Sequence, residues 1–271
     1  MSQSSEPMPD FKAPPVIEVV LGVQFDPLPN FLTAHYGLFW SLVKQEYPFL
    51  EDRPPLGEVF EGARGVEPKA EIELFDIPPL RRVFLIHTHR NYLMQLQPTR
   101  FHHNWRKLKE GDEYPRFGSA KQRFIKCWEA FQGFVADNKL GDVRFNQYEA
   151  TYVNHIVEAD GAFPVAIEDY SPTFSWKSAH STGFLPQPRS LNINLRFPLP
   201  QDRGALHVTY KHGKKVSDKK DVLILDLTAR GPAKLDGSDM EDWFDLAHEW
   251  IVRGFTDLTS ALAHKRWGRM Q

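Results

Sequence analysis

Two hydrophobic patterns along the chain predict β-strands. Residues 16–23 are crowded with β-branched side chains between prolines, and residues 143–156 alternate between aromatic or apolar and polar side chains. Both patterns are typical of strands. Residues 81–89 and 92–98 predict a hairpin, because Asn91 in the turn between them tolerates the left-handed backbone conformation. Further strands are expected at residues 191–197, 205–210 and 222–229, with a short one at 70–74.

A different pattern, with apolar residues three and four positions apart, predicts helices. The first expected helix is residues 30–47, with Asn30 as its N-cap, and the second is residues 117–138. The third covers residues 239 to about 267 along one continuous apolar stripe, and the S-x-x-E motif at 238–241 predicts a capping box. The apolar face of the first helix is expected to consist of Leu32, Tyr36, Phe39, Leu42 and Val43.

The order of these elements predicts an α+β fold. Hairpins with few short strand–helix–strand crossovers favour an antiparallel sheet, here of about seven strands, with three main helices packed on one face and a long helix at the C-terminal end. Residues 1–12 are polar and proline-bearing and are interpreted as a disordered tail, followed by a single domain over 13–271. The irregular residues 157–189 are interpreted as a long loop, with a subdomain seam as the alternative.

Charge and cysteine content narrow the function. Lys and Arg number 33 against 35 Asp and Glu, a net charge of −2. A protein that mainly coats nucleic acid would usually be basic, so any nucleic-acid contact is expected to be local. The single cysteine, Cys127, excludes an intramolecular disulfide framework and a multi-cysteine zinc site. With no membrane-length apolar run and no signal-like start, the sequence favours a cytoplasmic protein without membrane contact.

Motifs of the common nucleotide and cofactor sites are absent from the sequence. There is no Gly-x4-Gly-Lys-Ser/Thr loop, no G-x-G-x-x-G and no G-x-S-x-G. The sequence "HEWIV" at His248 begins like a zinc-protease helix, but Val252 stands where the second histidine is needed. We therefore expect no cofactor, and the sequence favours a non-enzymatic protein without deciding the question.

Histidines give the best case for a metal. His87 and His89 are two apart in an expected strand and project to the same face, and His102 and His103 follow in the next stretch. No carboxylate stands at a motif-like distance, so ordinary half-exposed strand histidines are the favoured interpretation. No metal site is assigned, and His87 and His89 stay the candidates.

The stretch "QLQPTRFHHNWRK", residues 95–107, gives the best case for a binding site. In extended geometry Gln95 and Gln97 share a face, and donors from the following residues lie close by. The favoured interpretation is a structural network in which Arg100 pairs with Glu149 of a neighbouring strand. The other is a polar pocket or partner surface. Its candidate ligand-binding or partner-binding residues are Gln95, Gln97, Arg100, Asn104, Trp105, Arg106 and Glu149.

A lysine-rich segment gives the best case for nucleic acid. The sequence "KHGKKVSDKKD" is expected at a hairpin tip, where phosphate contact is one interpretation and ordinary solvated surface is the other. The lysines concerned are Lys211, Lys214, Lys215, Lys219 and Lys220.

Four motifs together resemble a sporadically distributed bacterial protein family of unknown function. They are "PPVIEVVLGVQF", "QLQPTRFHHNWRK", "YEATYVNHI" and a last helix reading W-x-x-x-A-H-x-x-I-x-x-x-F-x-x-L, and they span nearly the whole chain. The resemblance implies a patchily inherited cytoplasmic protein of the kind found in defence or toxin–antitoxin loci, and it attaches no catalytic role to any residue. His102 and His103 stand where apolar residues are usual in the family. The matching positions are Glu18, Gln24, Gln95, Gln97, Arg100, Asn104, Trp105, Arg106, Tyr152, Asn154 and His248.

Two hypotheses of different classes follow. The leading one is a non-enzymatic protein that recognises a protein partner, as the antitoxin or accessory component of a defence-type locus, with exposed Trp105, Trp176 or Trp267 at the interface. The alternative is a nucleotide or nucleic-acid sensing or processing protein that uses the polar face around Arg100, with His87 or His89 as acid or base. A homodimer is open under both hypotheses. A DNA-binding regulator is disfavoured because no helix-turn-helix is recognisable.

Overall fold

The computed structural model describes residues 7–57, 59–61, 81–157, 167–172, 190–215 and 219–270. The strands of this part are β1 (Val16–Phe25), β2 (Phe49–Arg53), β3 (Arg82–Ile86), β4 (Tyr92–Gln97), β5 (Arg100–Arg106), β6 (Phe145–Ile156), β7 (Asn192–Pro198), β8 (Ala205–Lys214) and β9 (Asp221–Pro232). Its helices are α1 (Thr33–Val43), α2 (Arg116–Asp137), α3 (Ile167–Tyr170), a 3-10 turn at Pro200–Asp202, α4 (Met240–Leu258) and α5 (Ala261–Arg266).

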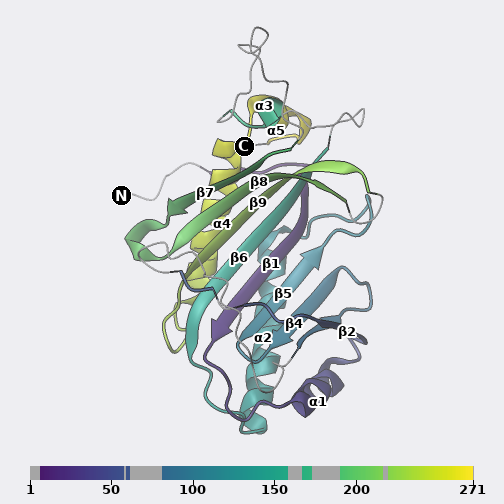
Figure 1. Cartoon of the computed structure of the whole chain (residues 1–271), viewed down its shortest axis with the longest axis vertical. Coiled ribbons are helices and arrows are strands. Elements are labelled where there is room, and N and C mark those ends of the chain that lie inside the picture. Colours follow the sequence, from purple (N-terminus) through teal and green to yellow (C-terminus); the bar gives the residue numbers. More distant parts are fainter. Residues whose placement is uncertain are drawn as a thin grey trace.

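Within the described residues, nine strands form one antiparallel sheet in the order β2-β3-β4-β5-β1-β6-β9-β8-β7 (Figure 1). The α+β class and the antiparallel sheet are confirmed, but the expected seven strands are too few. The edge strand β2 has mostly exposed side chains and therefore shows no alternation. The strand β5 follows a two-residue turn after β4, and its polar residues had made it look like the end of that strand.

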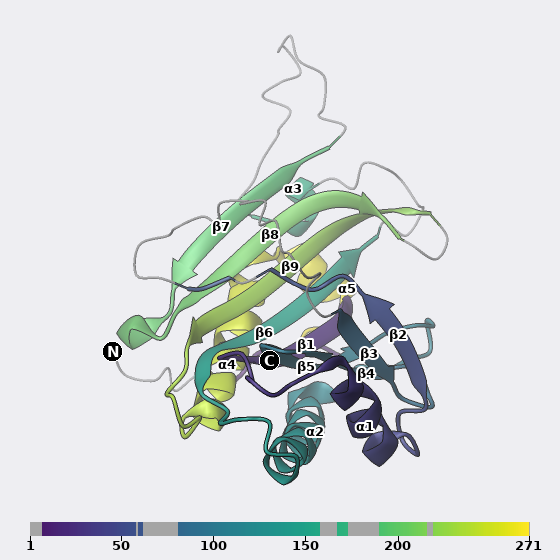
Figure 2. The ribbon, with the colours of Figure 1, turned by 60° about the horizontal axis from the view of Figure 1, so that its bottom comes forward.

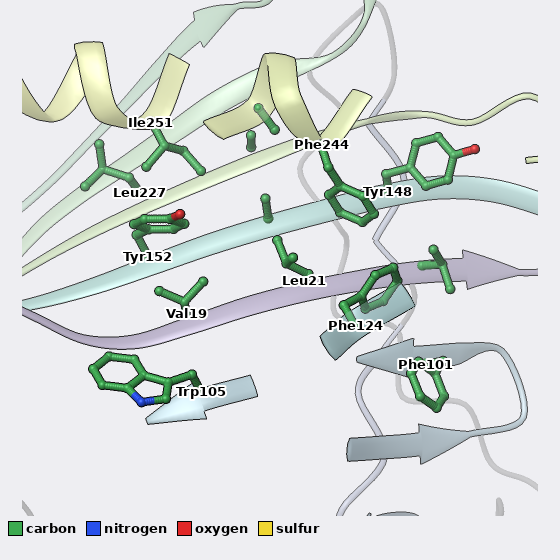
Figure 3. Close-up of a cluster of buried hydrophobic side chains, with 14 of the residues drawn as sticks. Val19, Leu21, Phe101, Trp105, Phe124, Tyr148, Tyr152, Leu227, Phe244 and Ile251 are labelled. Atoms are coloured by element: carbon green, nitrogen blue, oxygen red, sulfur yellow. The ribbon is translucent and has the colours of Figure 1, made fainter. Parts of the chain in front are cut away.

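The long helices lie on one side of this sheet (Figure 2). Helix α2 packs against β1 and β5, and α4 packs against β6, β8 and β9. Figure 3 shows the resulting core, in which side chains of the strands meet side chains of the two helices. The buried residues labelled there include Leu21, Phe101 and Tyr148 of the sheet, Phe124 of α2 and Phe244 of α4.

The topology contains a duplication. The first half runs β1, α1, the antiparallel strands β2 to β5, and α2, while the second half runs β6, the strands β7 to β9, and α4. In each half the first strand lies beside the last, so β1 pairs with β5 and β6 pairs with β9. The halves meet where β1 pairs with β6 in the middle of the sheet. The continuous sheet therefore joins residues from both halves on each face.

Helix α1 differs from the expectation at both ends and on its face. It begins after Leu32 rather than Asn30, whose side-chain amide instead donates to the carbonyl oxygen of Lys139 at 2.9 Å. Tyr36 and Phe39 are buried, whereas Leu32 and Leu42 are 64% and 67% exposed. The apolar stripe read from spacing is therefore only half correct.

The expected long C-terminal helix is interrupted. Helix α4 ends at Leu258, Thr259 is extended with φ −116° and ψ 150°, and Ser260 caps α5 by accepting a hydrogen bond from the backbone N–H of Ala263 at 3.1 Å. In the sequence the apolar spacing continues across the break to Leu262, but in the structure Leu262 is 45% exposed and its neighbour Ala263 is buried instead. A hydrophobic pattern alone therefore could not locate the break.

The predicted capping box is not formed. Asp239 is the N-cap of α4, without a side-chain capping bond, and its carboxylate instead accepts from the hydroxyl of Tyr148 at 2.9 Å.

The expected disordered tail is corrected for residues 7–12. Phe11 is buried, and the backbone N–H of Lys12 donates to the carbonyl of Gly268 at 3.0 Å. The strand expected at 70–74, most of 157–189 and Trp176 lie outside the described residues. Among the described helices, none has the length and apolar character needed to cross a bilayer.

Candidate functional site

The sheet face opposite the helices is lined with buried polar side chains. The structure brings Gln95, Gln97, Arg100, Asn104 and Glu149 together on this polar face, as the sequence predicted. The described polar residues of the face that are at most 8% exposed are Gln24, Gln95, Gln97, Arg100, His102, Asn104, Gln147 and Thr228.

Two of the predicted site residues do not belong to the centre of the face. Trp105 is 3% exposed and packs on the helix side, because alternation along β5 turns it away from Arg100 and Asn104. Arg106 lies at the end of β5, where its Nε donates to the carbonyl of Arg90 at 3.2 Å. Trp267 is also buried, at 9% exposure. The tryptophans expected at an exposed interface are therefore core residues wherever the structure describes them.

One part of the polar face is a linear chain of hydrogen bonds between amide and charged side chains. Arg82 donates to the side-chain oxygen of Gln95 at 2.7 Å, Gln95 donates to Asn104 at 2.7 Å, and Asn104 donates to Glu18 at 2.6 Å. Burial raises the pKa of Glu18, while the bond from Asn104 opposes the shift. This part of the face fits the structural interpretation, since each of these groups holds the next.

Glu149 pairs with Arg230, at 2.5 Å, and not in the expected ion pair with Arg100. The strand β6 that carries Glu149 has β9 as its second neighbour, and the register places Glu149 directly opposite Arg230. Burial alone would raise the pKa of Glu149, but the charge and hydrogen bond of Arg230, together with the nearby charge of Arg100, hold it below its usual value. The carboxylate stays ionised in the middle of the sheet.

The neighbouring histidines are neutral and packed. His102 lies over Gly22 on the polar face, and burial lowers its pKa to about 4. His103 points to the other side, with its Nε2 3.3 Å from the hydroxyl of Tyr47, and burial lowers its pKa to about 3. Both side chains act as packing and hydrogen-bonding groups at neutral pH.

The two metal candidates do not lie in a strand as expected, although their rings are 5.2 Å apart. His87 follows the end of β3 and His89 lies in the turn, where its backbone N–H donates to Nδ1 of His87 at 3.1 Å. Burial lowers the pKa of His87. Across the part of the chain that the structure describes, no group of three or more His, Cys, Asp or Glu side chains is placed to hold a metal ion.

A segment of the chain itself runs across the polar face. We call residues 54–57 and 59–61, which follow β2, the crossing segment (Figure 2). The side-chain amide of Gln97 both accepts from the backbone N–H of Leu56 at 3.1 Å and donates to its carbonyl at 3.2 Å. Gln147 donates to the carbonyl of Val59 at 2.8 Å and accepts from the N–H of Glu61 at 2.8 Å. All four of these bonds join a glutamine side chain to backbone groups of the crossing segment.

Charged side chains also bind the crossing segment near both of its ends. Arg100 donates to the carbonyl of Gly57 at 2.7 Å. The carboxylate of Glu61, 7% exposed, forms an ion pair with Arg196 at 2.5 Å and lies 2.6 Å from Nε2 of His207, within hydrogen-bond distance. Beside these partners the face is hollowed by a cavity of about 260 Å³. It is lined by Asn194, His207, Thr209, Asp226, Thr228 and Arg230, among others.

Gln24 lies in the same row of the sheet and is left without a partner. It stands directly between Arg100 on β5 and Gln147 on β6, and it is 4% exposed. Among the described residues, neither its amide nitrogen nor its amide oxygen has a hydrogen-bond partner. A buried amide without partners costs about 1–3 kcal/mol of folding free energy, so the crossing segment leaves Gln24 in an unfavourable environment.

The sequence did not predict that the crossing segment lies on the polar face, because the segment belongs to a connection rich in Pro, Gly and Glu. Its backbone is what the glutamines contact, and backbone groups are the same at every residue.

The lysine-rich segment forms the β8–β9 hairpin as expected, with Lys214 paired to Asp221 at 2.8 Å.

No model of a known protein family matches the chain, and no curated protein matches it in sequence.

Proposed function

We propose that this chain is a non-enzymatic binding protein whose polar face holds an extended segment of a partner protein. The observation that carries the proposal is the pair of two-point contacts that Gln97 and Gln147 make with a backbone. Hydrogen bonds to the main chain are how proteins commonly hold extended peptides, with side-chain pockets adding specificity.

The spacing of the contacts suits an extended chain that crosses the strands. From Gln97 on β4 to Gln147 on β6 there are three strand-to-strand steps. At about 4.8 Å a step this is roughly 14 Å. Residues 56 to 60 of an extended chain cover about 13–14 Å. A peptide in this orientation reaches both glutamines and passes over Gln24.

The chain's own crossing segment is an imperfect occupant of this face. Its five hydrogen bonds to Gln97, Arg100 and Gln147 are worth about 0.5–1.5 kcal/mol each, net of water. The side chain of Phe60 is 57% exposed, and Leu56 and Val59 are only partly buried, so the apolar side chains of the segment are incompletely covered. It also leaves Gln24 unsatisfied. A partner segment that supplies a donor and an acceptor to Gln24 has an advantage that the crossing segment lacks.

Charge indicates what the partner segment carries. Glu61 occupies a position between Arg196 and His207, so we propose an acidic side chain at the equivalent position of the partner. The neighbouring cavity of about 260 Å³ gives room for one further side chain. That the partner belongs to a defence or toxin–antitoxin pair rests on the family resemblance of the sequence alone.

The experiment uses two kinds of variant with opposite expected effects. Glu61→Ala removes the carboxylate contacts of the crossing segment and leaves the glutamines in place. Gln97→Ala combined with Gln147→Ala removes the contacts that any occupant would use. The probe is a fluorescein-labelled peptide with the sequence of residues 54–61, PPLGEVFE, and its binding to the full chain is followed by fluorescence anisotropy.

We expect E61A to bind the peptide more tightly than the unaltered chain does. Because Arg196 and His207 are 40% and 32% exposed, the lost ion pair with Arg196 and the lost contact with His207 are together worth only about 1–2 kcal/mol. This predicts a gain of roughly 5–30-fold. The double glutamine variant should lose binding. Glu51→Ala is the matched control, because Glu51 pairs with Arg53 on the edge strand and away from the crossing segment.

Two results would contradict the proposal. One is peptide binding that is the same in E61A and E51A. The other is binding that survives loss of both glutamines. Affinity purification of E61A from the native host extends the test, since a partner protein should be enriched there and lost with the glutamine variant. Bound nucleotide in place of protein, seen as absorbance at 260 nm, would favour the alternative of a nucleotide sensor at Arg100.

A further inference from the structure

A cavity on the opposite, helix-covered side of the sheet has no role in the proposed function. Its volume is about 420 Å³, within the range of roughly 300–1,000 Å³ usual for small-molecule sites. The start of α2, the strands β6 and β9, the helix α4 and the N-terminal segment around Phe11 all contribute to its wall. Figure 3 shows three of its residues, Tyr152, Leu227 and Ile251, on the helix side of the sheet.

The wall is largely apolar and is firmly built. Phe11 packs against Phe255 with ring centres 5.4 Å apart. The segment that carries Phe11 is fixed by backbone hydrogen bonds from Lys12 to Gly268 and from Ala13 to Trp267, both at 3.0 Å. An occupant of this cavity must therefore be apolar over most of its surface, since few groups of the wall can satisfy polar atoms.

One side of the cavity carries a chain of three hydrogen-bonding side chains. The hydroxyls of Tyr114 and Tyr152 are 2.9 Å apart, and the hydroxyl of Tyr152 is 3.0 Å from Nδ1 of His248. The ring of His248 is stacked on Phe117, with centres 4.0 Å apart and planes 9° apart. Packing and the hydroxyl of Tyr152 together fix the position of the imidazole.

This chain stays uncharged and has a free end. Burial lowers the pKa of His248 to about 4 and raises the pKa of Tyr114 to about 12, so both are neutral at pH 7. A neutral imidazole has one donor and one acceptor nitrogen. Nδ1 is engaged with Tyr152, while Nε2 makes no hydrogen bond with the part of the chain that the structure describes. Nε2 can therefore serve one polar group of a ligand.

The charges of the cavity lie at its mouth and cancel. Arg116 and Asp10 form an ion pair at 2.5 Å, with side chains 51% and 42% exposed. Arg116 also donates to the carbonyl of Phe11 at 3.3 Å. With its guanidinium engaged in this way, the site offers no excess of positive charge for an anionic ligand.

We infer that this cavity is a binding site for a small uncharged molecule, apolar over most of its surface, with one hydroxyl, carbonyl or N–H group held by His248. Tyr152 is a positioning residue, because its hydroxyl contacts Nδ1 of His248 and so fixes the orientation of the imidazole. The site is separate from the polar face, so it can be tested without any peptide or partner.

The probe for the test is N-phenyl-1-naphthylamine, an uncharged aromatic molecule with one N–H group that fluoresces in apolar surroundings. Its sulfonated analogue, 8-anilinonaphthalene-1-sulfonate, has the same aromatic body and a negative charge. We expect saturable binding of the uncharged probe at one site per chain. The anionic analogue should bind at least tenfold more weakly.

Two variants locate the binding. Val252→Phe places a ring into the cavity from α4 and should weaken binding tenfold or more, while Leu262→Phe, at a position of α5 that is 45% exposed, is the matched control. Tyr152→Phe keeps the wall and removes the hydroxyl, so it should weaken binding about two- to tenfold, the loss expected for one net hydrogen bond. Circular dichroism verifies that each variant is folded. If Val252→Phe is not folded, the binding measured with Tyr152→Phe tests the inference.

The inference is overturned if binding does not saturate or if the anionic probe binds as tightly as the uncharged one. It is also overturned if folded Val252→Phe binds like the Leu262→Phe control, or if Tyr152→Phe binds like the unaltered chain.

Discussion

Gly22 is the position where a single methyl group should disturb the polar face most. A Cβ atom built at Gly22 would lie 2.1 Å from Cδ2, 2.8 Å from Nε2 and 2.9 Å from Cγ of His102. Because His102 is 5% exposed in the middle of a sheet, its ring has little room to retreat. Gly22→Ala should therefore force the ring or the strand β1 to shift.

The magnitude follows from two opposing effects. Overpacking a filled site costs about 1–3 kcal/mol. Replacing glycine by alanine restricts the unfolded chain and returns about 0.4–1 kcal/mol. We expect G22A to lower the free energy of unfolding by about 1–2 kcal/mol. Gly37→Ala is the control, since nothing lies within 4 Å of its added Cβ, and in the helix α1 alanine should be stabilising.

Urea unfolding followed by circular dichroism gives the free energies. The cause is tested by a double-mutant cycle with His102→Ala, which leaves a hole into which the new methyl group fits. The double variant should be more stable than the sum of the single losses predicts, by about 1 kcal/mol or more. A G22A protein as stable as the unaltered chain, or losses that simply add, would refute the steric reasoning.

Two further predictions concern thiol reactivity and acid. Burial raises the pKa of Cys127, so the native chain should be inert to Ellman's reagent at pH 8 and react with one equivalent once unfolded in urea; rapid reaction of the native thiol would contradict its burial. Burial lowers the pKa values of His102, His103 and His248 to about 4, 3 and 4, so below their unfolded value of about 6.5 the unfolded chain binds more protons than the folded chain. The free energy of unfolding should therefore decrease as the pH is lowered, by up to about 4 kcal/mol per pH unit near pH 5. In His103→Phe, urea unfolding should show a weaker dependence of stability on pH. A profile that is level between pH 7 and 4.5 would be inconsistent with neutral buried histidines.

The sequence predicts those parts of the fold whose pattern is local. The alternation in residues 145–156 and the β-branched run before Phe25 identify the two central strands, because their side chains are sorted by burial. The strand β2 could not be found this way, since an edge strand with exposed residues has no sorted faces. The strand β5 has six of its seven side chains buried, polar ones included, which hides the alternation.

The candidate site shows the same division between local and long-range information. Alternation from Gln95 to Asn104 groups the polar residues correctly, and applied to Trp105 it would have placed that residue on the helix side. The ion-pair partner of Glu149 depends on which strand pairs with β6 on the side away from β1. That strand is β9, and local sequence patterns do not reveal this pairing. The crossing segment is held through its backbone, and the cavity at His248 needs the N-terminal segment beside α4.

The duplicated topology has a consequence for synthesis on the ribosome. Residues 16–137 already contain β1 to β5 with both of their helices, and the pairings among these strands are complete before β6 is made. Chains commonly fold in this order as they emerge. During that interval the inner edge of β1, an apolar strand that β6 later covers, is open to a neighbouring chain. A nascent or truncated chain that ends in the 138–144 connection is therefore expected to pair β1 with β1 of another copy, as a dimer of identical halves.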